Sequence, residues 1–182
     1  MKKLLIPILM IFFGKSFAQN QEKFVLESKD LGEVFTSKFI YNRYNCGGQN
    51  FSPELHWKNA PTNTKSFAIT LFDPDAPTGH GWWHWLIFNI PANTNYLPTG
   101  AGSKFPELLP QQVVQSINDY GELGYGGPCP PKGHGPHHYI FTIYALDTAA
   151  LNLPPDTAPK IVNQYIQKHS IAHTSFTSIY ER

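Results

Sequence analysis

The sequence predicts a mainly β, single-domain protein with one helix near the end of the chain. Its length of 182 residues is that of one ordinary domain. Short runs of aromatic and β-branched residues alternate with clusters of Gly, Pro, Asn and Asp, a pattern typical of antiparallel sheets. Helical periodicity is convincing in one late segment, and the sequence shows neither an internal repeat nor a domain linker.

Seven segments have the composition of β-strands. Residues 83–90 are nearly all apolar, which indicates a central strand covered on both faces, and Pro91 ends this run. Residues 35–44 are mixed and aromatic and give no clear assignment. The strongest strand pattern covers 139–146, and the remaining predicted strands cover 24–31, 55–57, 66–72, 112–117 and 172–180.

The predicted helix follows Thr157, which is a candidate N-cap because its hydroxyl can accept from a free amide of the first turn. Pro159 is tolerated in that first turn, where its missing N–H is not needed. Residues on one face then recur at helical spacing: Ala158, Ile161, Val162, Tyr165, Ile166 and His169.

Residues 1–18 have the pattern of a secretory signal peptide. Two lysines precede the apolar run 4–13, and Ser16 and Ala18 supply small residues at positions −3 and −1 of a cleavage site. The apolar run is too short to span a bilayer, which disfavours the alternative of a retained anchor. We therefore expect an exported protein, periplasmic or secreted.

Cleavage after Ala18 leaves residues 19–182 as the mature domain, with 11 basic against 13 acidic side chains. The formal charge moves from +1 to −2, because three lysines and no acids are lost. A chain so close to neutral has no basic surface for nucleic acid or anionic membrane.

Two cysteines, Cys46 and Cys129, fit export to an oxidising compartment. An even count there favours one disulfide between them. A metal site is the weaker alternative, because neither residue belongs to a CxxC pair. A nucleophilic role for Cys129, which lies near histidines in the sequence, is also weak.

Two segments place charged or polar groups in apolar sequence. The first, 73–91, carries two aspartates and a histidine among aromatic residues, and the second, 125–139, is rich in Gly and Pro. Such groups are costly to bury without partners, so we expect the segments to form two walls of one cavity. Their polar residues are Asp73, Asp75, His84, His134, His137 and His138.

Three chemistries compete for this cavity. A metal site needs three or four converging ligands, but the spacing of His80 and His84 helps only on a helix, which Gly81 and two tryptophans argue against. Carboxylate-based hydrolysis needs acids on opposite walls, whereas Asp73 and Asp75 share one stiff stretch. The third chemistry is an anion pocket, and a hydrogen-bonded network without a ligand remains the bland alternative.

In the anion pocket, imidazole N–H groups and the amides of Gly126 and Gly127 donate to the ligand. Asp73 orients an imidazole and favours its charged form. We expect the carboxylates to hold His84 and His137 as imidazoliums whose second nitrogens face the ligand.

These residues resemble the signatures of the phosphatidylethanolamine-binding protein (PEBP) family. The first signature is similar to Asp73-Pro74-Asp75-Ala76-Pro77 followed by His84-Trp85, and the second to 126–133 followed by His137-His138-Tyr139. Residues 46–53 and 118–119 resemble the bacterial Raf kinase inhibitor-like branch, named YbhB/YbcL.

The resemblance implies a β-sandwich with a small anion-binding pocket at one end. It places in that pocket Asp73, Asp75, His84, Gly127, Pro130, Pro131, His137 and Tyr139. It also implies kinase or protease inhibition in some members, and the bacterial branch is often dimeric, so a homodimer is among the expectations.

We therefore predict an exported, non-enzymatic binding protein for phosphate, phosphorylated headgroups or similar small anions, without a cofactor or metal. A protein-interaction module that inhibits a kinase or protease is the alternative, and a metal-dependent hydrolase is a more distant one.

Overall fold

The computed structural model describes residues 22–182, so the predicted signal peptide and its cleavage site lie outside the described residues. Two antiparallel sheets form the body of the fold, which confirms the mainly β prediction. A small sheet has the order β1-β2-β5, from Val25–Glu27, Leu55–Lys58 and Tyr96–Leu97. A larger sheet has the order β6-β4-β3-β7-β8, from Val114–Gln115, Trp82–Pro91, Ser66–Asp73, His137–Leu146 and Ser170–Tyr180.

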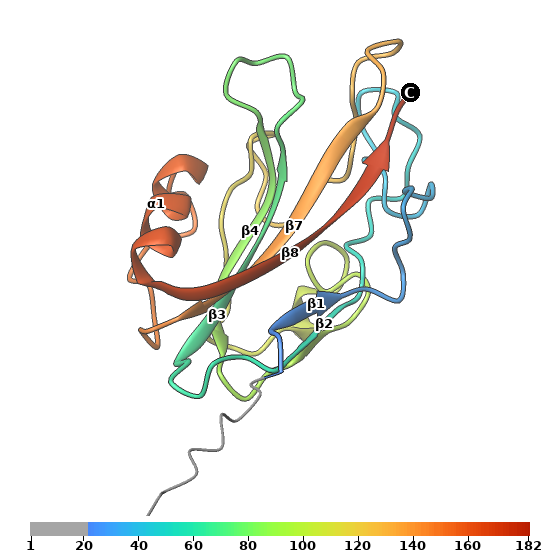
Figure 1. The fold of residues 1–182 in the computed structure, drawn as a ribbon. Helices are drawn as coiled ribbons and strands as arrows, with labels where there is room; N and C mark the ends of the chain where they lie inside the picture. The colour runs from blue at the N-terminus through green and yellow to red at the C-terminus, as the bar shows by residue number, and fades with distance from the viewer. Residues whose placement is uncertain (1–21) are drawn as a thin grey trace, which may run out of the picture.

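The larger sheet lies between two layers. The small sheet covers one face and helix α1 (Pro159–His169) covers the other (Figure 1). Strand β3 is accordingly buried on both faces, with Phe67, Ile69 and Leu71 in the core between the sheets and Ala68 in the core below the helix. This alternation follows from the two-residue period of a strand.

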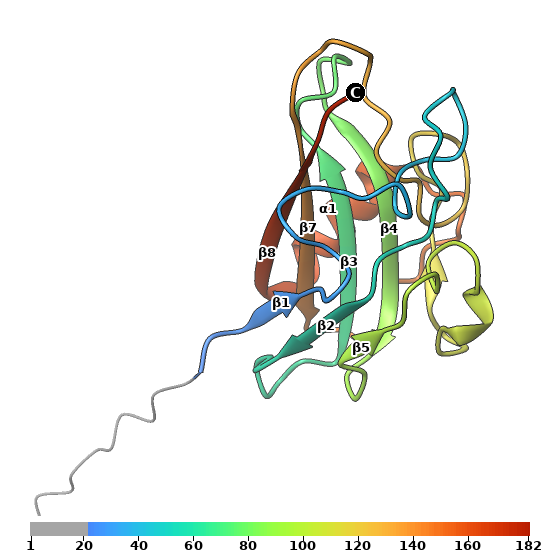
Figure 2. The same cartoon turned by 90° about the vertical axis from the view of Figure 1, so that its right-hand side faces the viewer.

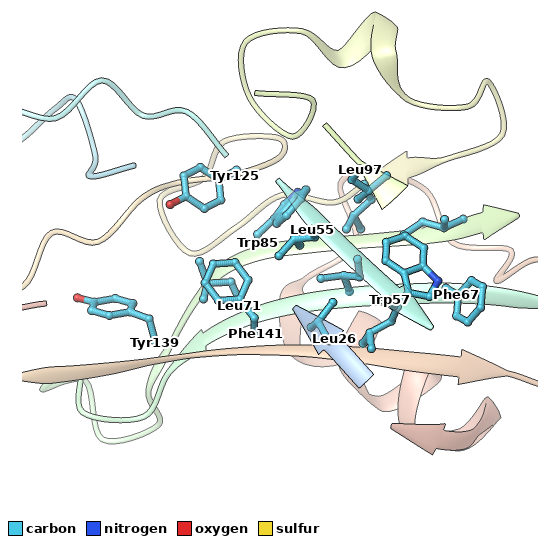
Figure 3. Close-up of a cluster of buried hydrophobic side chains, with 14 of the residues drawn as sticks. Leu26, Leu55, Trp57, Phe67, Leu71, Trp85, Leu97, Tyr125, Tyr139 and Phe141 are labelled. Carbon is cyan, nitrogen blue, oxygen red and sulfur yellow. The ribbon is translucent and has the colours of Figure 1, made fainter. Parts of the chain in front are cut away.

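The core between the sheets is aromatic. Trp57 of β2 meets Phe67 of β3 edge to face there, and Tyr139 lies at one edge of the cluster (Figure 3). The second core packs Val162 and Ile166 of α1 on the larger sheet. The predicted central strand 83–90 corresponds to β4, which lies between β6 and β3.

Local predictions were less accurate at the element ends. The predicted strands 24–31 and 112–117 contract to β1 and β6, of three and two residues. The helix N-cap is Ala158, without a side-chain cap, and the Thr157 hydroxyl instead donates to the Pro154 carbonyl at 2.7 Å. Thr157 closes the preceding turn, so the helix starts one residue later, with Pro159 in its first turn.

The antiparallel register places both predicted segments at one end of the larger sheet. Strand β3 ends at Asp73, while β7 begins at His137 and pairs Ile140 with Phe72. The β3–β4 turn, the loop that leads into β7 and the end of β8 lie together at the top of Figures 1 and 2.

Within residues 22–182, no helix is long and apolar enough to cross a membrane.

Candidate functional site

A cavity of about 430 Å³ opens at this end of the sheet. Six of the eight residues predicted to bind a ligand line it: Asp73, His84, Pro130, Pro131, His137 and Tyr139. The other two, Asp75 and Gly127, lie outside its lining. Residues that were not predicted to bind a ligand complete the wall: Tyr44, Ala76, Pro77, Thr78, Trp82, Asp119, Tyr120, Cys129 and Arg182.

Asp73 and His137 form a buried pair on the cavity wall. Nδ1–H of His137 donates to Oδ2 of Asp73 at 2.7 Å, and both side chains are almost fully buried. The second ring nitrogen, Nε2, lies 2.7 Å from Nδ1 of His134. The expectation that this nitrogen faces the ligand is therefore wrong for the described arrangement, because both nitrogens of His137 have protein partners.

Asp75 forms a separate pair outside the cavity. Its Oδ2 accepts from the amide and from Nδ1–H of His138 at 2.7 and 2.8 Å. Partial burial pushes the pKa of Asp75 up, but these hydrogen bonds outweigh it and leave the pKa below its ordinary value. The Asp75 amide donates to Oδ1 of Asp73 at 2.8 Å, so Asp75 stiffens the turn that holds Asp73.

His84 lies on the cavity floor between two tyrosines. Its ring centroid is 5.5 Å from that of Tyr120 and 5.2 Å from that of Tyr139. Its Nδ1 meets the carbonyl of Gly126 at 2.8 Å, and because a carbonyl only accepts, Nδ1 carries the proton. The prediction that a carboxylate holds His84 is therefore wrong.

Burial also changes the charge of His84. Desolvation lowers its pKa to about 4, although the Gly126 carbonyl and the charge of Asp73 act in the opposite direction. The ring is consequently neutral at physiological pH, and its Nε2 is an acceptor. The expected imidazolium at this position is corrected to a neutral imidazole.

The two glycine amides serve the fold. The Gly126 amide donates to the carbonyl of His84 at 2.9 Å, and that of Gly127 donates to Oδ1 of Asn50 at 2.8 Å. A Cβ on Gly127 would lie 2.2 Å from the carbonyl oxygen of Phe39, so close packing requires glycine here. The prediction that these amides donate to a ligand is thus not supported by their geometry.

Three buried donors of the cavity lining have no hydrogen-bond partner among the described residues. They are the Tyr139 hydroxyl, the indole Nε1–H of Trp82 and the guanidinium Nε–H of Arg182. A buried donor without a partner is rare and costs roughly 1–3 kcal/mol, so a cluster of them at one cavity points to a missing acceptor. Sequence reasoning selected only Tyr139 from this set.

Aromatic side chains form the remaining wall. The rings of Tyr41 and Tyr120 stack with centroids 4.1 Å apart, and Trp82 meets Tyr120 edge to face at 5.3 Å. Burial raises the pKa of the Tyr120 and Tyr139 hydroxyls above the ordinary tyrosine value. Both hydroxyls therefore remain protonated donors throughout the physiological pH range.

A disulfide between Cys46 and Cys129 closes the rim, as predicted. It joins the loop that carries Tyr44 to the Gly-Pro segment that carries Pro130 and Pro131.

Across the described part of the chain, no group of three or more His, Cys, Asp or Glu side chains is arranged to hold a metal ion.

The comparisons with known proteins agree with this architecture. The profile of the family described as phosphatidylethanolamine-binding protein matches residues 28–181. The chain belongs to this family. Within the family it is 40% identical over 183 residues to the UPF0098 protein YbcL of Escherichia coli, covering 100% of this chain and 99% of that protein. It is 41% identical over 157 residues to E. coli YbhB, covering 85% and 98%.

Solved PEBP structures share the fold. The crystal structure of E. coli YbcL, described as a new member of the mammalian PEBP family, matches with a TM-score of 0.85 and 42% identity over 88% of this chain and 99% of that chain. A PEBP homologue from Chlamydia trachomatis matches with a TM-score of 0.72 and 28% identity over 87% and 97%. These matches confirm the family, the YbcL/YbhB branch and the β-sandwich expectation.

Proposed function

We propose that this protein binds phosphate, a phosphorylated headgroup or a similar small anion in the cavity, without transforming it. The observation that carries the proposal is the pair of unpartnered donors, Tyr139 Oη–H and Trp82 Nε1–H, in the lining of one cavity. An anion can accept from such donors, and hydrogen bonds to a charged acceptor are worth roughly 1.5–3 kcal/mol each. The volume suits a small molecule.

Because His84 is neutral, anion binding beside it should be coupled to the uptake of a proton. A bound anion stabilises the charged form of the ring and draws a proton onto its Nε2. The complex then holds one proton more than the free protein and the free anion hold together at neutral pH. We therefore expect phosphate affinity to rise as pH falls from 8 towards 6.

Two side chains of the lining that could act as nucleophiles, Thr78 and Cys129, are engaged in the fold. The hydroxyl of Thr78 donates to the Gly81 carbonyl at 2.6 Å, and Cys129 is held in the disulfide. Both nitrogens of His137 are also in use, which leaves it no free site to act as a general base. These contacts support binding without catalysis. Inhibition of a kinase or protease stays a prediction.

Calorimetric titration of the mature protein with inorganic phosphate tests this proposal, and the chain offers a matched pair of tryptophans. Trp82 and Trp57 both have a buried indole N–H without a partner among residues 22–182, but only Trp82 lines the cavity. We expect one site in the wild type, and about tenfold weaker binding in Trp82→Phe, which equals loss of about 1.4 kcal/mol.

Trp57 lies in the core between the sheets, so folded Trp57→Phe should bind phosphate like the wild type. Absence of a saturable phosphate site in the wild type, or equal losses in the two variants, would contradict the proposed function. Repeating the wild-type titration at pH 6 and pH 8 tests whether phosphate binds more tightly at the lower pH, as expected.

We also propose that the protein is exported, which the Cys46–Cys129 disulfide supports because such bonds persist in oxidising compartments. Mass spectrometry of protein recovered from an exporting host should find Gln19 at the N-terminus. A retained Met1 would contradict this proposal.

A further inference from the structure

Arg182 reaches the cavity wall from the far end of the sequence. Strand β8 pairs with β7 in a register that places Tyr180 opposite His137. The chain after β8 therefore continues along the loop before β7, where the Gly133 amide donates to the main-chain oxygen of Arg182 at 2.8 Å. This backbone contact fixes the start of the arginine side chain at the cavity.

The guanidinium is also fixed at its tip. Its Nη1 donates to the Tyr44 carbonyl at 3.2 Å and lies 2.8 Å from Sγ of Cys46, so the side chain lies across the disulfide. Both contacts use Nη1. The buried Nε–H has no partner in the described structure, and Nε lies on the edge of the guanidinium that matches two oxygens of a phosphate or carboxylate.

The charges of the cavity lining make this arginine necessary for an anion. Asp73 and Asp119 both line the cavity, and the Trp83 amide donates to Asp119 at 2.7 Å. His84 is neutral near pH 7. Among the described residues of the lining, Arg182 alone carries a permanent positive charge, because the lining includes no lysine and no second arginine.

We propose that Arg182 is the anion-binding cation of the cavity, and that its free Nε edge selects ligands with a terminal phosphate or carboxylate over uncharged ones. This inference rests on the proposed function. The positioned guanidinium offsets the repulsion from Asp73 and Asp119 and presents two parallel donors without a further loss of side-chain freedom.

Calorimetry with inorganic phosphate at low and physiological ionic strength tests the assignment in the wild type and three variants. R182Q keeps a polar side chain without the charge, and we expect at least tenfold weaker binding and a flatter salt dependence. R182K keeps the charge but not the planar edge, so an intermediate loss is expected. Arg43 pairs with Glu122 outside the cavity lining, so R43Q should bind phosphate like the wild type.

The outcomes separate this inference from the proposed function. If the wild type binds phosphate, and R182Q and R182K bind it equally well, the arginine assignment is overturned while the anion pocket stands. If the wild type binds no phosphate, both fall. Urea unfolding of each variant shows whether it is folded. If R182Q does not fold, the phosphate affinity of R182K tests the proposal alone. A several-fold weaker affinity supports the arginine assignment, and wild-type affinity in R182K would overturn it.

Discussion

Two aspartate–histidine pairs lie at the same end of the sheet and differ chiefly in burial. Asp73 pairs with His137 at 2.7 Å, and their side chains are 4% and 1% exposed. Asp75 pairs with His138 at 2.8 Å, and their side chains are 39% and 52% exposed. Two pairs of the same residue types thus lie in different surroundings, one on the cavity wall and one largely in solvent.

The difference arises from strand geometry. His137 and His138 are neighbours in β7, so their side chains point to opposite faces of the sheet. Asp73 is the last residue of β3, whereas Asp75 lies beyond it in the turn. The comparison teaches that burial decides which pair belongs to the candidate site, because only Asp73 and His137 line the cavity with the unpartnered donors.

Substituting each aspartate should break the two pairs very unequally. Asp73→Asn removes the hydrogen bond between the buried Asp73 and His137 side chains, and a hydrogen bond to a charged group is worth about 1.5–3 kcal/mol, so we expect the free energy of unfolding to fall by about 2–3 kcal/mol. Asp75→Asn should lower it by no more than about 1 kcal/mol, since water replaces the lost contacts at an exposed pair. Urea unfolding at pH 7 measures both, and equal losses would contradict the distinction.

The pH dependence of stability should sharpen the comparison. The unfolded chain protonates His84 near pH 6.5, but burial lowers the folded pKa to about 4. Between pH 6.5 and pH 4 the unfolded state binds more protons than the folded state. Acidification through this range therefore lowers the free energy of unfolding by up to about 3 kcal/mol relative to its value above pH 6.5. Asp75, whose folded pKa is lowered from 3.8, should lose its small contribution only below that value.

Urea unfolding across pH 3–8 separates the two windows. His84→Gln should flatten the profile between pH 6.5 and 4, whereas Asp75→Asn should change it only below about pH 4. An unchanged slope in His84→Gln would show that the histidine is charged in the folded protein.

The sequence predicted much of the fold because its signals are local. Aromatic, β-branched and apolar runs bounded by turn residues located β3, β4, β7 and β8, and the even cysteine count together with the predicted export led to the disulfide. The meeting of Asp73 and His137 also followed from two motifs at strand ends. Other parts of the site depend on long-range register, which no local pattern encodes. Arg182 enters through the pairing of β7 with β8, and the partner of His84 is a backbone carbonyl rather than a side chain.

The central claim is that the unpartnered donors of the cavity are kept for a ligand, and two buried tyrosines test it most directly. The hydroxyl of Tyr125 donates to the Phe39 carbonyl at 2.7 Å within the fold, while that of Tyr139 has no partner among residues 22–182. Both rings belong to the core between the sheets. The matched variants are Tyr125→Phe and Tyr139→Phe.

The deciding measurement is urea unfolding of both variants with and without inorganic phosphate. Without phosphate, Tyr125→Phe should lose about 1 kcal/mol, because its hydrogen bond is removed, and Tyr139→Phe should be at least as stable as the wild type. Phosphate should stabilise Tyr125→Phe as much as the wild type and Tyr139→Phe distinctly less. The contradicting result has two parts: without phosphate Tyr139→Phe is as destabilised as Tyr125→Phe, and phosphate stabilises it as much as it stabilises the wild type. That result would show that the Tyr139 hydroxyl stabilises the fold and is not kept for a ligand.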